Sequence, residues 1–91
     1  MHETNPNNQI RKYRRKCNFK LKDVALLMNK KSSAHISHWE KGRKLPNLKN
    51  TLLLSATLKC PTEVLFSDLF ARVRHEVFER KKSHNLFERY D

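Results

Sequence analysis

Apolar residues recur at every third or fourth position of this sequence, in short blocks that polar residues separate. The first two blocks are Ile10, Tyr13 and Cys17, followed by Leu21, Val24, Ala25 and Met28. Positions three and four apart share one face of an α-helix, so each block predicts a short amphipathic helix. The 91 residues include only one Gly and three Pro, too few turn formers for a sandwich or barrel. The sequence therefore predicts an all-α protein.

Later blocks continue the same period. Ser32 or Ser33 can cap a third helix, whose inward residues are Ile36 and Trp39 and which ends at Gly42. A fourth helix is marked by Leu48, Leu52, Leu53 and Ala56, and a fifth begins near Pro61 and includes Leu65 and Phe66. We expect a flexible arm at 1–8, a compact bundle of five short helices at 9–66, and a C-terminal amphipathic helical extension at 67–91.

The net positive charge is confined to the first two thirds of the chain. The net charge is +11, and residues 1–59 carry all of it, with fourteen Lys and Arg against three acids. Residues 60–91 are neutral, with six residues of each sign. A concentrated excess of this size indicates a polyanionic partner, either the phosphate backbone of a nucleic acid or an anionic membrane surface.

Several classes of function are disfavoured. The longest uncharged apolar run, 51–58, is much shorter than the roughly 20 residues of a membrane span, so no transmembrane segment is expected. His35 and His38 lack a third ligand nearby, and neither cysteine has a second cysteine or a histidine within four residues, so no metal site or cofactor is expected. We found no nucleophile elbow, phosphate loop or paired acids and predict no enzyme. Two cysteines and a polar start suggest a reduced, cytoplasmic protein.

The segment from Ile10 to Phe66 resembles the lambda-repressor-like helix-turn-helix family, the phage Cro and cI repressor type. The residues that carry the resemblance are Ile10, Arg11, Tyr13 and Arg14 in the first helix, Ala25 in the second, and Ile36, Ser37, Trp39, Glu40, Gly42 and Pro46 in and after the third. The resemblance implies a double-stranded DNA partner and a recognition helix at about Ser33 to Lys41. It also implies an ion pair between Arg14 and Glu40, for which a loose surface pair is the alternative.

The resemblance assigns two sets of DNA contacts. The outer side of the third helix would contact base edges through Ser33, Ala34, Ser37, His38 and Lys41. Phosphates would be contacted by Lys20, Lys22, Lys31, Ser32, Arg43 and Lys44, with Lys30 and Lys49 near them. The alternative is that these are merely exposed polar residues. Ala25 and Ile36 are eleven positions apart where the family has ten, which shifts the register of the turn by one residue.

The C-terminal stripe has two interpretations. Leu69, Val73 and Val77, with Phe70 and Phe78 beside them, either pack back on the fourth helix or form a self-association surface for a homodimer. The favoured function is a sequence-specific transcriptional regulator, most simply a repressor. One alternative is an antitoxin-like or other protein-interaction module in which DNA binding is secondary, and another is RNA or nonspecific nucleic-acid binding.

Overall fold

The computed structural model describes residues 8–87, and helices are the only regular elements within that range. The helices are α1 (Ile10–Lys16), α2 (Leu21–Leu27), α3 (Ala34–Glu40), α4 (Leu48–Leu58), α5 (Thr62–Leu65) and α6 (Ser67–His84). The predicted all-α class, with five short helices and a C-terminal helical extension, is confirmed. Of the arm predicted at 1–8, all but Asn8 lies outside the described residues.

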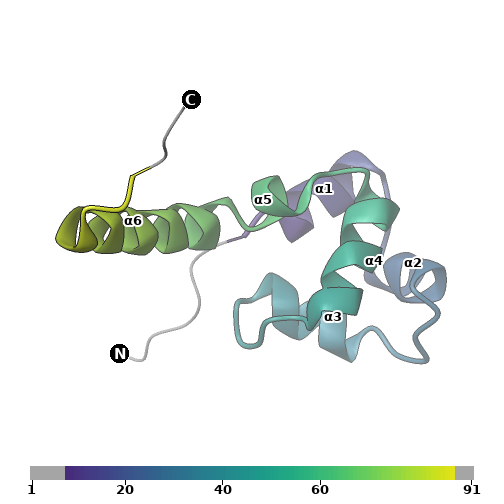
Figure 1. Ribbon diagram of the computed structural model, residues 1–91. Coiled ribbons are helices and arrows are strands. Elements are labelled where there is room, and N and C mark those ends of the chain that lie inside the picture. The colour runs from purple at the N-terminus through teal and green to yellow at the C-terminus, as the bar shows by residue number, and fades with distance from the viewer. Residues whose placement is uncertain (1–7, 88–91) are drawn as a thin grey trace.

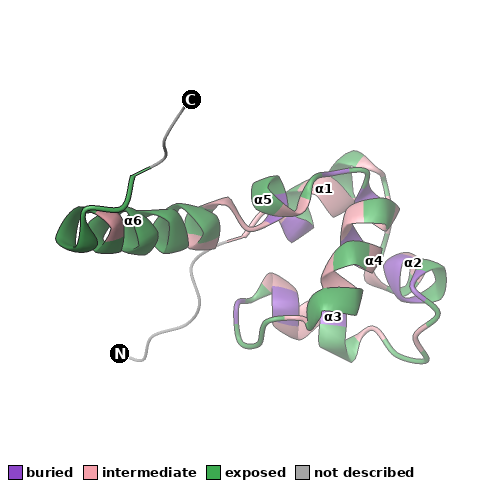
Figure 2. Ribbon diagram, viewed as in Figure 1, coloured by how far each residue is buried: buried purple, intermediate pink, exposed green. Residues whose placement is uncertain are grey.

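A single small core holds α1 to α5 together. Its buried side chains are Ile10, Val24, Ala25, Met28, Ile36, Trp39, Leu54, Leu58, Cys60 and Leu65. Each of the five helices contributes at least one of them, and Figure 2 shows that burial is concentrated in this part of the molecule. Burial of apolar side chains is the main stabilising term of a small domain, so α1 to α5 are held as one unit.

The turn between α2 and α3 follows from local backbone chemistry. Asn29 ends α2 in the left-handed region with φ 59°, which Asn tolerates better than most residues. The amide of Lys30 then donates to the carbonyl of Ala25 at 2.8 Å, and the hydroxyl oxygen of Ser32 accepts from the amide of Ala34 at 3.0 Å. Both ends of the turn are therefore satisfied before α3 begins.

The fourth helix forms where the apolar spacing predicts it, but two of the leucines that mark it do not face the core, whereas Leu53 packs against it. Leu48 and Leu52 are exposed by 74% and 55%, whereas Leu54 and Leu58 are buried. Three consecutive leucines at 52–54 are compatible with more than one helical face, so periodicity alone does not choose among them. The neighbours of α4, which include α1, α2 and α5, select the face that carries Leu54 and Leu58.

The C-terminal helix leaves the domain instead of packing on it. The apolar spacing continues past Phe66, but the helix is interrupted there, and a φ of −118° and a ψ of 46° at Phe66 separate α5 from α6. Figure 1 shows α6 projecting sideways from the domain, and none of its 18 residues is buried. The interpretation that Leu69 to Phe78 pack back on the fourth helix is therefore wrong.

Candidate nucleic-acid interface

The third helix is anchored through one side and presents the other. Ile36 is fully buried and Trp39 is 5% exposed, as predicted for its inward side. At 100° per residue, Ala34, Ser37, His38 and Lys41 lie on the opposite side. Ala34 and Lys41 are exposed, and Ser33, Ser37 and His38 are half-buried. The structure thus brings the predicted base-contacting residues together at the surface, while their contact with bases stays a prediction.

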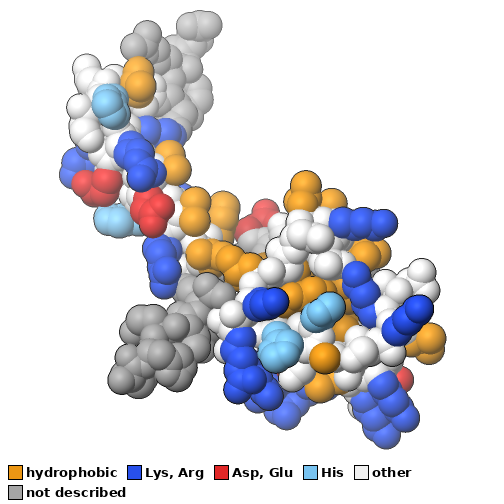
Figure 3. Space-filling view, turned by 90° about the horizontal axis from the view of Figure 1, so that it is seen from below, with side chains coloured by type: hydrophobic (Ala, Val, Ile, Leu, Met, Phe, Trp, Pro, Cys, Tyr) orange, Lys and Arg blue, Asp and Glu red, His pale blue; other side chains and the backbone are white. Residues whose placement is uncertain are grey.

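Cations lie on the elements that flank α3. Lys20 and Lys22 belong to the start of α2, Lys31 to the turn before α3, and Arg43 and Lys44 to the loop after it, and all are exposed. Ser32 is exposed as well; its oxygen accepts from Ala34, and its hydroxyl proton remains available to an anion. Figure 3 shows Lys and Arg side chains around the histidines on this face. Their phosphate contacts also stay predictions.

One exposed residue beside this face was not in the predicted base-contacting set. His35 is exposed, and its ring stacks on that of Trp39 with centroids 6.3 Å apart and planes at 25°. The signal was its place directly after Ala34, four positions before the tryptophan, a spacing that brings two side chains together on a helix. Because the indole holds the imidazole, His35 enters any complex with less rotamer freedom to lose than a free side chain has.

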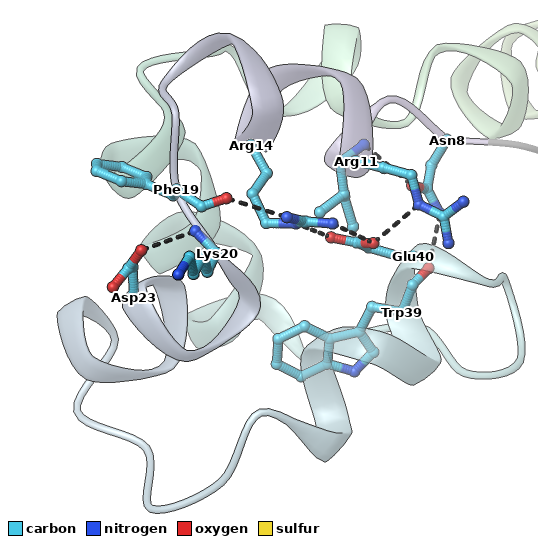
Figure 4. Close-up of polar contacts among 9 residues, drawn as sticks. Asn8, Arg11, Arg14, Phe19, Lys20, Asp23, Trp39 and Glu40 are labelled. Carbon is cyan, nitrogen blue, oxygen red and sulfur yellow. Dashed lines mark hydrogen bonds and ion pairs between the residues drawn. The ribbon is translucent and has the colours of Figure 1, made fainter.

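A buried ion-pair cluster connects α3 to α1. The Glu40 side chain is only 2% exposed, and its carboxylate accepts from Arg14 Nε at 2.5 Å and from Arg14 Nη2 at 3.3 Å. Arg14 also donates through Nη1 to the carbonyl of Phe19 at 3.0 Å (Figure 4). Arg11 Nε, unforeseen as a partner, donates to the same carboxylate at 3.2 Å. Two guanidinium groups therefore neutralise one buried carboxylate.

Asn8 fixes the same end of α3 through the backbone. Its Nδ2 donates to the carbonyl of Trp39 at 2.7 Å, and its Oδ1 accepts from the amide of Ile10 at 3.1 Å (Figure 4). The amide of Gln9 donates to the carbonyl of Leu65 at 2.8 Å. The entry to α1 thus joins the C-terminal end of α3 to α5, and the angle of α3 is set by polar contacts as well as by its apolar side.

The start of α2 is capped differently from that of the resembled family. Lys20 stands where the resembled family has Ser or Thr, and a lysine side chain accepts no hydrogen bond. Asp23 supplies the other half of a capping box, because its Oδ2 accepts from the Lys20 amide at 2.7 Å. Its negative charge also lies in the first turn, where the helix dipole favours an acid. The Lys20 side chain is left exposed at the surface.

Other kinds of site find little support between Asn8 and Phe87. No group of three or more His, Cys, Asp or Glu in this range is placed to hold a metal ion. No helix there has the length and apolar character to cross a membrane. Cys17 and Cys60 are free thiols, and burial raises the pKa of the Cys60 thiol, against the opposing effects of a hydrogen bond with Tyr13 and the charge of Lys16.

Comparison with known proteins assigns the region that contains this surface. A family model described as helix-turn-helix matches residues 10–65, which span α1 to α5 and cover more than half of the chain. No curated protein matches the sequence. The family is a DNA-binding one, and its match ends just before α6 begins. The chain belongs to the helix-turn-helix family of the lambda-repressor-like, Cro and cI type.

Proposed function

We propose that this protein is a sequence-specific regulator of transcription, a repressor, that inserts α3 into the major groove of double-stranded DNA. The observation that carries the proposal is the two-sided environment of α3. Its inner side is held by Ile36, Trp39 and the Glu40 cluster, while its outer side is polar and flanked by exposed cations. An α-helix fits the major groove of B-DNA, and this arrangement leaves one side of α3 available to do so.

The outer side supplies groups that read bases. Ser37 and His38 can donate to the acceptors on base edges, and the Ala34 methyl group can contact a thymine methyl group. Lys41 suits the O6 and N7 acceptors of guanine, and Ser33 lies at the N-terminal end of α3, which approaches the base pairs first. We add His35 to this set, because it is exposed on the same helix and held against Trp39.

The flanking residues position the protein on the duplex. Lys20, Lys22, Lys31, Ser32, Arg43 and Lys44 would contact phosphates on the two sides of the groove, which sets orientation but reads no sequence. Repression needs only that the bound protein occupy a site that transcription uses. A homodimer through Leu69, Val73 and Val77 would place two copies of α3 on neighbouring half-sites.

An antitoxin-like role is the second candidate, and the exposed stripe on α6 is the observation that favours it. Phe70, Val73 and Val77 are each exposed by more than 40%. A partner protein that covered this stripe would leave the surface around α3 unchanged. The two candidates therefore differ in what covers α6 and agree on DNA contact through α3.

The proposal is tested with duplexes selected from a random pool and then titrated beside random duplex. His38→Ala should weaken binding to the selected duplex by about 1–3 kcal/mol and leave random duplex unaffected, since a base contact carries sequence information. Lys44→Ala should weaken binding to both duplexes about equally, because a phosphate contact carries none.

Salt dependence gives an independent measure. Five flanking cations predict a slope of about −4 to −5 in log affinity against log salt for each bound protomer, and Lys44→Ala should reduce it by about one. Arg15→Ala is the matched control, since this exposed arginine lies on α1 and has no proposed contact. Equal affinity for selected and random duplex, or a flat salt dependence, would refute the proposal.

A further inference from the structure

A stripe of exposed apolar side chains runs along α6. Val73 and Val77 are each 43% exposed and Phe70 is 44% exposed, although helical spacing aligns them with Phe66 and Leu69. Figure 3 shows hydrophobic side chains continuing from the domain onto the base of α6. A contiguous apolar face of this kind marks an interaction site in a folded protein.

The stripe runs into a groove of about 430 Å³ at the base of α6. Its lining comes from the loop after α3, from α4, from α5, from the break at Phe66 and from the first two turns of α6: Leu45, Pro46, Thr51, Thr62, Glu63, Phe66, Leu69, Phe70 and Val73. Glu63 is the only charged residue in this lining. Because the stripe and the groove share Leu69, Phe70 and Val73, one occupant can cover both.

We propose that the occupant is a second copy of this chain, whose α6 runs antiparallel to the first and overlaps it over residues 66–77. In this register Phe66 of one copy lies opposite Val77 of the other, and Phe70 lies opposite Val73. Apolar residues then cover apolar residues along the whole stripe. One turn further on, Arg80 reaches the groove beside Glu63 of the second copy, and the two-fold symmetry repeats this contact.

Charge decides between the two directions. A parallel pair would also bury the stripe, but it would place Glu63 beside Glu63 of the second copy and gather the cations of both C-terminal turns. The last turn of α6 contains Lys81, Lys82 and His84, and Arg80 directly precedes it. Like charges at short distance oppose association, whereas the antiparallel pair sets opposite charges together.

The arrangement suits the proposed function, on which it rests for its biological meaning. In this register the two copies of Phe66 lie about 16 Å apart along the helices, and the antiparallel pair carries one domain beyond each end of the overlap. Two recognition helices on neighbouring half-sites need a separation of about 34 Å, one turn of DNA. Figure 1 shows α6 directed away from α3, so pairing through α6 leaves the DNA-facing surface uncovered.

The second copy is tested by sedimentation equilibrium of the full chain without DNA, so that failure of dimerisation is separate from failure of DNA binding. The unaltered chain should form a dimer, and Val73→Lys should raise the dissociation constant at least about tenfold, because it places a charge in the apolar overlap. Leu26→Lys is the matched control, since Leu26 is 77% exposed on α2 and should leave the dimer unchanged. A monomeric chain, or a Val73→Lys variant that still dimerises fully, overturns the proposal.

The direction is tested by exchanging charges. Glu63→Lys and Arg80→Glu should each weaken the dimer about fivefold, and the double variant should restore it. Both residues are exposed at the surface, so the fold should persist in each variant. No recovery in the double variant overturns the antiparallel register.

A disulfide gives a second readout of direction. In a Cys17→Ser background, Val77→Cys should form no disulfide between the two copies. Antiparallel pairing keeps position 77 of one copy about 16 Å along the helices from position 77 of the other. Rapid formation of that disulfide would mean a parallel pair and overturn the proposal.

Discussion

At the scale of single residues, Glu40 connects most parts of the proposed interface. It is one of only three acids in residues 1–59, and its carboxylate is 2% exposed with Arg14 and Arg11 as donors. Arg14 continues to the carbonyl of Phe19, so one cluster joins α1, α3 and the segment before α2. The angle of α3 to the bundle therefore depends on a carboxylate that is almost entirely shielded from solvent.

Replacing Glu40 with Gln tests this cluster. Glu40→Gln keeps the shape but leaves the Arg14 guanidinium, whose side chain is 11% exposed, without a counter-charge. We expect a loss of about 3 to 5 kcal/mol in the free energy of unfolding, measured by urea denaturation. Arg11→Ala is the control and should cost less than about 1 kcal/mol, because the Arg11 side chain is 50% exposed. Equal, small losses in the two variants would mean a loose surface pair.

At the scale of elements, short helices meet through residues in the left-handed region. Asn18, Asn29, Gly42 and Lys59 have φ between 52° and 71°, and each lies just after or at the end of one of the first four helices. Helices of seven residues have few internal hydrogen bonds, so their end geometry has a large influence on where the next helix starts.

Asn29 offers a test at this scale. Asn29→Ala should destabilise the protein by about 1 kcal/mol, because alanine pays a steric penalty at φ 59°. The free energy of unfolding of Asn29→Gly should lie within about 0.5 kcal/mol of that of the unaltered chain, since glycine adopts this φ freely but loses more entropy on folding. Thermal unfolding of both variants measures the difference, and an alanine variant as stable as the glycine variant would contradict the assigned end of α2.

At the scale of the whole molecule, α6 lies outside the core that holds α1 to α5 together. The family match ends at residue 65. Among the described residues, the last buried member of the core is Leu65, Phe66 packs against it while partly buried, and α6 has no buried residue. The chain is interrupted at Phe66, between α5 and α6. We propose that α1 to α5 form the DNA-binding domain and that α6 serves association.

A chain that ends at Asp68 tests the separation. Its midpoint of thermal unfolding, measured by circular dichroism at low protein concentration, should lie within about 5 °C of that of the full chain, because the truncation exposes little core. It should sediment as a monomer and bind a single half-site through α3. Loss of cooperative unfolding in the truncated chain would show that α6 contributes to the core.

The sequence determined the helices, the helix-turn-helix motif and the inward side of α3, because these depend on spacing between residues close along the chain. Ile36 and Trp39 are inward in the pattern and in the structure. The residue pairs that orient α3 are far apart in sequence, as with Asn8 and Trp39, 31 positions apart. A pattern of residues close along the chain does not predict contacts between residues so far apart.

Only the tertiary structure decided which leucines of α4 face inward and whether α6 returns to the domain. Several faces of the run at 52–54 are equally apolar, and the choice of Leu54 depends on which helices surround α4. The apolar spacing of α6 would be the same whether this helix packed on the core of its own domain or on another surface. The interruption at Phe66 turns α6 away, because a chain's direction after a break is set by a few backbone dihedrals that hydrophobic spacing does not encode.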